Sequence, residues 1–155
     1  MKKYILVLIF IVLPLLSFAQ EQKIIAKMGI LDARFNGVDF TDWSISQKNY
    51  LVLFINEDDK FCLSNVTEQG QSFGTVSLID HQSYPKTKEG YKSDLFKMRW
   101  SYNNTYDEKK GSAIIELMVT DKPHAQIYEL KMILDNMDVN VYKGYIDGSV
   151  NLSNF

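Results

Sequence analysis

The stretch "FKMRWSYNNTYDEKKGSAIIELMVT", residues 96–120, alternates apolar and polar side chains on both sides of a short charged turn. Before the turn, Phe96, Met98, Trp100 and Tyr102 fall on one face of an extended chain, and polar residues fall on the other. After the turn, apolar residues again occupy alternate positions. This period of two is typical of half-buried antiparallel strands, so the stretch predicts a hairpin with one aromatic and aliphatic face.

Similar segments recur along the chain at intervals of roughly 10–15 residues, which is the spacing of an all-β sandwich or barrel. Short turns join most of them, and consecutive strands usually lie side by side, so we expect an antiparallel meander. Closure into a small barrel would remove the exposed edges of such apolar strands, and we therefore favour a barrel over a barrel-like sandwich. The expected strands, about eight in number, are 23–30, 50–55, 60–66, 72–80, 94–106, 112–120, 126–134 and 139–150.

Two longer segments, 31–49 and 81–93, are expected to connect these strands. The first contains an Asn36-Gly37 pair, a turn signal, and a "DFTDWSISQ" stretch long enough for one helical turn. The second is polar throughout most of its length.

The first nineteen residues predict a secretory signal peptide. Lys2 and Lys3 precede a 13-residue apolar stretch, and Ser17 and Ala19 place small residues at the positions before a cleavage site. A spanning helix needs about 20 apolar residues, so we expect cleavage after Ala19 rather than a membrane anchor. The expected product is a single all-β domain, residues 20–155, without a transmembrane segment and exported to the periplasm or the extracellular space.

This leader, with its two lysines, Ile/Leu/Val run and final "SFAQ", resembles those of exported proteins from Bacteroidetes-type bacteria. The rest of the chain, including "VYKGYIDGS" at 141–149, is similar to small uncharacterised secreted β proteins of the same group. The resemblance implies a host lineage and an export route, and it assigns no functional residue.

Composition argues against several classes of partner and of chemistry. Beyond the leader the chain has 15 basic and 19 acidic side chains, a net charge of −4, with no basic cluster, so nucleic acid is not an expected partner. Cys62 is the only cysteine, which excludes an intramolecular disulfide. The sequence leaves open whether its thiol is reactive or is a small buried apolar group.

No known catalytic or nucleotide-binding motif occurs in the sequence, and we expect neither enzymatic activity nor a cofactor. His81 and His124 both fall in expected connections, and with Cys62 they are too few and too far apart for a structural zinc site. The acidic stretch "NEDDK", residues 56–60, lacks the spacing of a calcium loop and is better explained as a solvated turn.

The aromatic residues Trp100, Tyr102, Tyr128 and Trp43 are the candidate ligand-binding residues. Packed core is the alternative for the first three, because a small barrel is just wide enough to be filled by side chains or to hold one ligand. Trp43 lies outside the expected strands, where it would either plug one end of the fold or contact a partner.

Two functions therefore remain open. One is a binding module for a small apolar or saccharide ligand, which would resemble lipocalin-like proteins in outline although the chain lacks their Gly-x-Trp at the first strand. The other is an envelope-associated or extracellular module that presents the 31–49 and 81–93 segments to a protein partner. An internal cavity would favour the first function, and a filled interior with exposed aromatic residues would favour the second.

Overall fold

The computed structural model describes residues 23–86 and 90–147. Strands dominate these residues, and one short helix lies near the beginning of the chain. The elements are β1 (Lys23–Phe35), β2 (Val38–Asp39), α2 (Thr41–Ser46), β3 (Tyr50–Ile55), β4 (Phe61–Thr67), β5 (Gly70–Tyr84), β6 (Ser93–Asn104), β7 (Lys110–Lys122), β8 (Ala125–Leu134) and β9 (Val139–Asp147).

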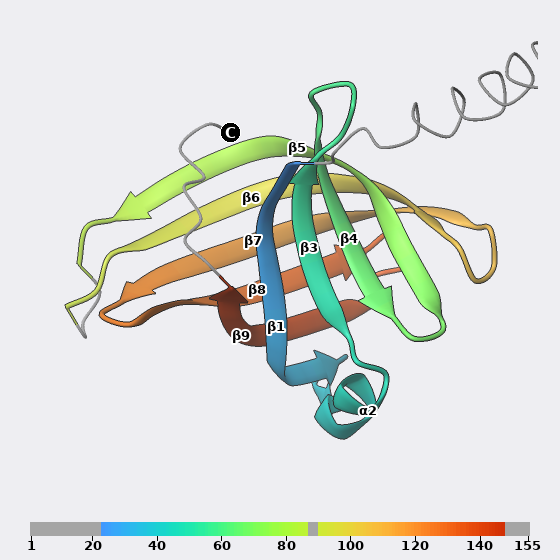
Figure 1. Cartoon of the computed structure of the whole chain (residues 1–155), viewed down its shortest axis with the longest axis horizontal. Coiled ribbons are helices and arrows are strands. Elements are labelled where there is room, and N and C mark those ends of the chain that lie inside the picture. Colours follow the sequence, from blue (N-terminus) through green and yellow to red (C-terminus); the bar gives the residue numbers. More distant parts are fainter. Residues whose placement is uncertain (1–22, 87–89, 148–155) are drawn as a thin grey trace, which may run out of the picture.

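The strands form an antiparallel barrel, which confirms the predicted fold class and decides between barrel and sandwich. Sequential pairing runs from β1 and β3 through to β9, and β9 then pairs with β1, so eight strands close and β2 remains as an extra strand on β1. In Figure 1, β1, β3 and β4 cross in front of β6 to β9, and the long strand β5 bends from the first group to the second. The barrel is therefore flattened into two crossing layers joined at bent strands.

Two glycines permit the bends that close the barrel. At Gly74 on β5, an added Cβ would lie 1.9 Å from the carbonyl oxygen of Ser101 on β6. At Gly144 on β9, it would lie 1.8 Å from the carbonyl oxygen of Gly29 on β1. Neighbouring backbones approach this closely only where no side chain stands between them, as at tight bends and barrel corners.

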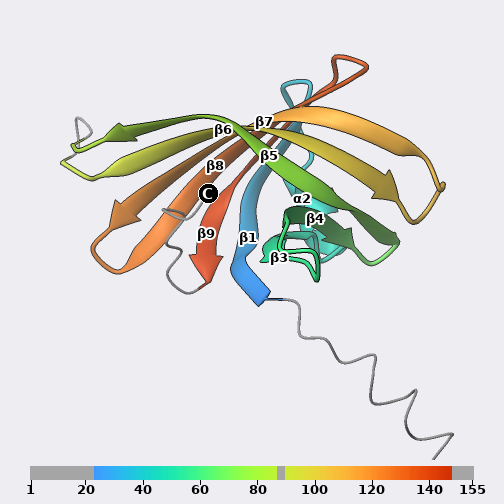
Figure 2. The ribbon, with the colours of Figure 1, turned by 90° about the horizontal axis from the view of Figure 1, so that it is seen from above.

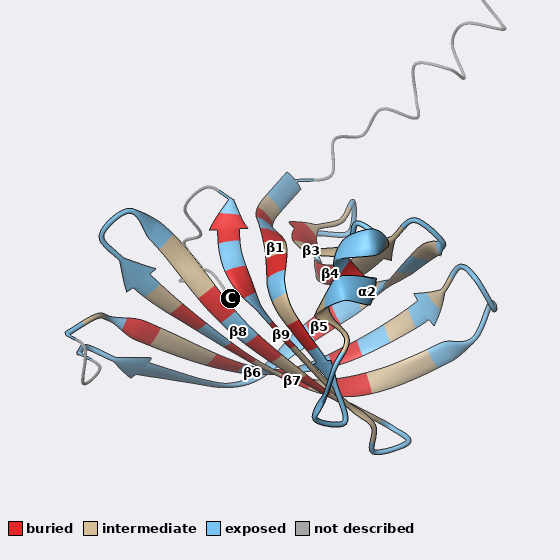
Figure 3. Cartoon of the chain, turned by 90° about the horizontal axis from the view of Figure 1, so that it is seen from below, coloured by how far each residue is buried: buried red, intermediate tan, exposed pale blue. Residues whose placement is uncertain are grey.

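The hairpin from which the sequence analysis began supplies much of the core. Trp100 is 2% exposed, and its indole N–H donates a 3.1 Å hydrogen bond to the carbonyl oxygen of Leu63. Figure 3 shows buried positions gathered toward the middle of the strands, with exposed residues at the hairpin ends. The cluster of buried residues from this hairpin consists of Phe96, Met98, Trp100, Ala113, Ile115, Leu117 and Val119.

The expected connection 81–93 is partly strand, which corrects the prediction. β5 continues to Tyr84, pairing with β6 as far as Ser93, so His81 lies in a strand rather than in a connection. The ring of His81 stacks on Phe96 with centroids 4.5 Å apart. Residues 81–84 are exposed on both faces of the strand, so they lack the apolar and polar alternation that predicts a half-buried strand. A β-bulge between Leu78 and Asp80 precedes them.

The expected connection 31–49 is also more ordered than predicted. β1 extends to Phe35, and the Asn36-Gly37 pair makes the predicted turn, with φ angles of 50° and 82° that fit a tight hairpin. α2 follows at one end of the barrel, below the lower ends of β1 and β3 in Figure 1. The predicted end of the last strand, near Val150, lies outside the described residues.

α2 is tied to the barrel by the residues that precede and begin it. The backbone N–H of Phe40 donates to the carbonyl oxygen of Ala33 at 3.0 Å, and the N–H of Ala33 donates to the Thr41 hydroxyl at 3.0 Å. The Phe40 ring meets Tyr142 edge-on, with centroids 6.1 Å apart. Figure 2 shows α2 on the side of the molecule where β3 and β4 lie, away from the spread hairpins at the opposite side.

Candidate ligand-binding hollow at one end of the barrel

The structure separates the four predicted ligand-binding residues. Trp100 and Tyr128 are 2% and 3% exposed and belong to the packed core. Tyr102 is partly buried, and its ring lies 4.3 Å from that of Trp100. Trp43 lies on α2 and is 49% exposed. The aromatic face of the hairpin is therefore core, and it does not line a central chamber with Trp43.

Tyr128 carries one unusual feature within that core. Its hydroxyl is buried and has no hydrogen-bond partner. Burial, which is the largest cause, together with the nearby Tyr142 and Tyr145, raises the pKa of this phenol well above its ordinary value, so it stays protonated. Its ring packs beside Gly144, at the corner where β9 meets β1.

Trp43 instead lines a hollow at the α2 end of the barrel, which we call the end hollow. Its volume is about 290 Å³, and its walls come from α2, the start of β3, the β4–β5 hairpin, the end of β6 and β9. The lining residues are Trp43, Asn49, Asn65, Thr67, Gln69, Gly70, Gln71, Ser72, Tyr106 and Tyr142.

Strand alternation directs two asparagines into this hollow. Leu51 and Leu63 point into the barrel on neighbouring strands, and both are buried. Asn49 stands two residues before Leu51, and Asn65 stands two residues after Leu63, so both continue the inward faces of β3 and β4. The antiparallel register brings these positions to the same end of the barrel, because Asn65 pairs with Leu51.

Tyr142 on β9 joins the two asparagines. The Asn65 side-chain amide donates to the Tyr142 hydroxyl at 3.4 Å. Burial, the largest cause, raises the pKa of Tyr142, while side-chain hydrogen bonds from Asn65 and Asn49 act in the opposite direction. The phenol therefore remains protonated at neutral pH and can both donate and accept.

The amide oxygens of these asparagines have no partner. Oδ1 of Asn49 and Oδ1 of Asn65 are buried atoms without a hydrogen bond, and Asn49 as a whole is 8% exposed. An unpaired buried acceptor costs about 1–3 kcal/mol relative to a paired one. Two residues that line the end hollow therefore carry buried acceptor atoms for which the described part of the chain supplies no donor.

Two exposed aromatic rings stand at the rim of the hollow. Trp43 is held by Phe40, with ring centroids 5.9 Å apart, and Tyr106 is 61% exposed. None of the residues that line the end hollow is charged. The hollow thus combines flat apolar surfaces at its mouth with neutral polar groups at its base, the combination that orients small ligands in binding pockets.

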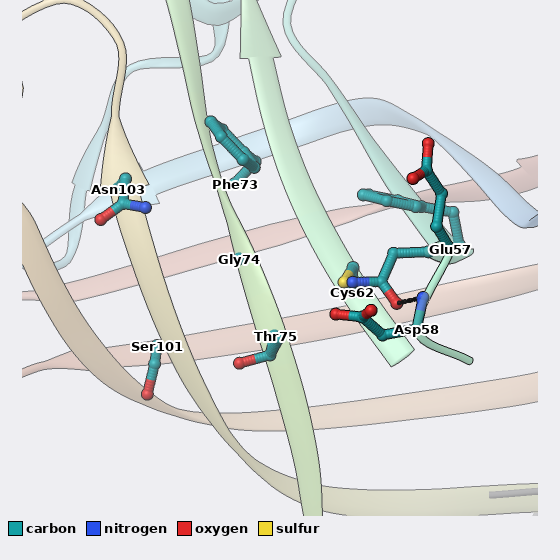
Figure 4. Close-up of a pocket in the computed structure, with 10 residues that line it drawn as sticks. Glu57, Asp58, Cys62, Phe73, Gly74, Thr75, Ser101 and Asn103 are labelled. Atoms are coloured by element: carbon teal, nitrogen blue, oxygen red, sulfur yellow. Dashed lines mark hydrogen bonds between the residues drawn. The ribbon is translucent and has the colours of Figure 1, made fainter. Parts of the chain in front are cut away.

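A second hollow, of about 430 Å³, lies on the outer face of β3 to β6, and we call it the outer groove (Figure 4). Figure 4 shows Asp58 and Cys62 on one side of it, Phe73 and Thr75 along β5 in the middle, and Asn103 on the far side. The remaining lining residues are Phe54, Asn56, Glu57, Gly74 and Ser101.

Among the residues that line the outer groove, no buried side-chain nitrogen or oxygen lacks a hydrogen bond. The Asn56 side-chain oxygen accepts hydrogen bonds from the backbone N–H groups of Asp58 and Lys60, at 3.1 and 2.9 Å. Cys62 is buried, and burial, the largest cause, raises the pKa of its thiol. These features fit the quiet apolar alternative for Cys62, because a raised pKa disfavours the reactive thiolate.

Candidate catalytic and metal-binding groups were also located. His81 Nε2 lies 3.1 Å from Asp94 Oδ1, and Lys92 lies 2.9 Å from the other oxygen of Asp94. Burial alone would raise the pKa of Asp94, but hydrogen bonds from Lys92, Ser83 and His81 bring it below its ordinary value. Within residues 23–86 and 90–147, no three His, Cys, Asp or Glu side chains are grouped so that they could hold a metal ion.

Comparisons with known proteins give no relative for this chain. No protein-family model matches it, and neither a curated protein nor a solved structure matches it. In the part of the chain that the structure describes, no helix is long and apolar enough to cross a membrane.

Asn49, Asn65 and Tyr142 were not among the residues predicted from the sequence. A signal for Asn65 was present, because it continues the inward alternation of Phe61 and Leu63 as a polar residue where an apolar one is expected. Tyr142 carried no comparable signal, since only the closed barrel brings β9 to this end.

Proposed function

We propose that this protein is an exported, non-enzymatic β-barrel that binds a small neutral polar ligand in the end hollow. The observation that carries the proposal is the pair of buried, unpartnered oxygens of Asn49 and Asn65 beside the half-exposed ring of Trp43. A ligand that donates hydrogen bonds to both oxygens would remove the cost of leaving them unpaired. The packed centre of the barrel directs the proposal to this end rather than to an apolar ligand inside.

The proposal is tested by NMR titration of the ¹⁵N-labelled protein with three kinds of probe. N-methylacetamide and glycerol are neutral and polar, cyclohexane is apolar, and acetate and ethylammonium are charged. We expect saturable shifts of the Asn49 and Asn65 side-chain amides and of the Trp43 indole with neutral polar probes. Tighter binding of cyclohexane, or shifts confined to the outer groove, would contradict the proposal.

A second candidate function is a protein-interaction module, and one observation favours it. The segment around α2 exposes three large hydrophobic residues, with Val38 at 69% and Ile45 at 57% exposure in addition to Trp43. Such clusters mark interaction surfaces more often than scattered exposed residues do. If this is the function, Val38→Ser and Ile45→Ser will abolish partner capture by the immobilised protein, whereas Asn65→Leu will leave it unchanged.

A further inference from the structure

The end hollow excludes charged ligands by its own chemistry. All ten residues that line it are neutral at physiological pH. Of the charged residues next to these positions in the chain, Lys48 forms an ion pair with Glu68, Asp107 with Lys109 and Lys143 with Glu129, and Asp42 adjoins Trp43. A charged ligand would lose its hydration on entering the hollow and would find no opposite charge in return.

The unpartnered oxygens also specify what the ligand must offer. The Asn65 amide donates to the Tyr142 hydroxyl, and Asn49, Asn65 and Tyr142 all line this one hollow of about 290 Å³, so a single small molecule there would lie beside both asparagines. Carbonyl oxygens accept and cannot donate, so each requires an N–H or O–H group from the ligand. A hydrocarbon would leave both oxygens unpaired, and a compound with a single donor would leave one.

The rim sets a different requirement. Trp43 and Tyr106 present exposed ring faces at the mouth of the same hollow. Aromatic side chains contribute binding by burying flat apolar area, so the ligand needs an apolar face as well as a polar edge. Pyranose rings have this division, with C–H groups on their faces and adjacent hydroxyls around their edges.

The size of the hollow limits the ligand to about one ring. Its volume of about 290 Å³ stands at the lower end of the range of roughly 300–1,000 Å³ found for small-molecule sites. The mouth is open at Trp43 and Tyr106, so further rings of a longer chain would remain outside.

We infer that the end hollow binds one neutral pyranose ring, free or at the end of a glycan. Adjacent hydroxyls of the ring donate to Asn49 Oδ1 and Asn65 Oδ1, and one C–H face packs on Trp43. This inference rests on the proposed function of the end hollow and adds the chemical class of its ligand.

The test is an NMR titration with methyl glycosides of glucose, galactose, mannose and N-acetylglucosamine. Two matched probes each contain one of the two required features. Tetrahydropyran has the ring without hydroxyls, and glycerol has adjacent hydroxyls without the ring. We expect at least one glycoside to shift the side-chain amides of Asn49 and Asn65 and the Trp43 indole. Its affinity should exceed that of either matched probe by about tenfold or more, the weight of one or two hydrogen bonds.

Paired variants locate the binding. Asn65→Leu and Trp43→Ala should each lower the affinity for the glycoside by about tenfold, the change expected for one lost hydrogen bond or stacking contact. Asn103→Leu in the outer groove and Ile45→Ala, at an exposed position of α2, should leave the affinity for the glycoside unchanged. Neither residue lines the end hollow. Circular dichroism of each variant separates lost binding from lost folding.

The outcomes distinguish this inference from the proposed function. If glycerol or N-methylacetamide binds at Asn49 and Asn65 and no glycoside binds more tightly, the saccharide inference is wrong and the proposed function stands. If none of the neutral probes binds there, both fail. Glycoside binding that Asn65→Leu leaves intact would also overturn the inference.

Discussion

The end hollow and the outer groove are both open to solvent, but the asparagine oxygens that line them differ in their hydrogen bonding. In the outer groove the Asn56 oxygen accepts two backbone hydrogen bonds and fixes the β3–β4 turn. In the end hollow the oxygens of Asn49 and Asn65 are buried and accept none. An asparagine that hydrogen-bonds to its own backbone stabilises the fold, whereas one that is buried without a partner lowers stability, a cost that the proposed ligand would remove.

The difference also extends to the aromatic residues. In the outer groove Phe54 is buried and Phe73 is 38% exposed, while Trp43 and Tyr106 at the end hollow are 49% and 61% exposed. Volume alone would favour the outer groove, which is the larger of the two. Unpaired acceptors and exposed rings, rather than size, identify the end hollow as the binding site we propose.

The largest expected effect concerns the backbone under the outer groove. Gly74→Ala would place a Cβ 1.9 Å from the Ser101 carbonyl oxygen, so β5 and β6 must separate at the barrel corner. We expect the free energy of unfolding to fall by about 3 kcal/mol, near the upper end for overpacking. Urea unfolding followed by circular dichroism measures this change.

Gly37→Ala is the matched control for that experiment. Gly37 has a positive φ of 82° but nothing within 4 Å of an added Cβ, so we expect a loss of about 1 kcal/mol from backbone strain alone. Equal losses for the two variants would show that the close approach at Gly74 carries no special weight.

The second prediction tests the structural role of the outer-groove asparagine. Asn56→Ala removes the oxygen that accepts from the N–H groups of Asp58 and Lys60. Each such bond contributes roughly 0.5–1.5 kcal/mol, and the freed N–H groups are open to water, so we expect a loss of about 1–2 kcal/mol. Asn103→Ala, in the same groove, is the control with no expected change, and unfolding in urea compares the two.

The third prediction has the opposite sign and concerns the end hollow. Asn65→Leu replaces an amide with an unpartnered buried oxygen by an apolar group of similar size, and it also removes the amide's hydrogen bond to the Tyr142 hydroxyl. That hydrogen bond is long, at 3.4 Å, so its loss should cost less than removing the unpaired oxygen gains. We expect the free energy of unfolding of the ligand-free protein to rise by about 1 kcal/mol while ligand binding is lost, the usual trade between stability and function. A loss of stability of the same size would mean that ordered water satisfies Asn65 and would remove the contrast between the two regions.

The smallest expected effect is a pH response at α2. Hydrogen bonds from the backbone N–H and then the side chain of Thr41 lower the pKa of Asp39 below 3.8. Because the folded pKa is depressed, the stabilisation is complete above about pH 4 and is lost as the pH falls through the folded value. We expect the Trp43 indole NMR signal to move on acidification from about pH 5 to pH 3, and Asp39→Asn to abolish this movement. The indole signal of Trp100, buried in the core, serves as the internal reference.

The alternation of apolar and polar residues was enough to predict the fold class, because within most strands it shows which face is buried. Residues 96–120 predicted the hairpin with its apolar face, and Asn36-Gly37 predicted the turn. The prediction failed where a strand is exposed on both faces, as at residues 81–84, which continue β5 beyond the predicted end at Asp80. There the sequence looked like a polar connection.

The site was harder to predict than the fold, because it depends on missing hydrogen-bond partners and on space left between strands that are distant in sequence. The sequence indicated aromatic residues on one face of the strands, but it did not show that Trp100 and Tyr128 would be buried in the core. It placed Trp43 outside the strands correctly and could not show that Tyr106 and Tyr142 would stand beside it. An inward-facing asparagine near the end of a strand was the usable signal, and it becomes informative only when the barrel's open end is known.

The pairing of β1 with β9 has a consequence for how the chain reaches this shape. Lys27 pairs with Asp147, so the hydrogen bonds that seal the cylinder join segments from nearly opposite ends of the described chain. Contacts so distant in sequence form late and slowly, because a long loop must be ordered first. During synthesis, one edge of β1 stays unpaired until β9 has been made. Aggregation would compete with folding in this partly folded state. Chaperones that bind the nascent chain would therefore be needed most before β9 has been synthesised.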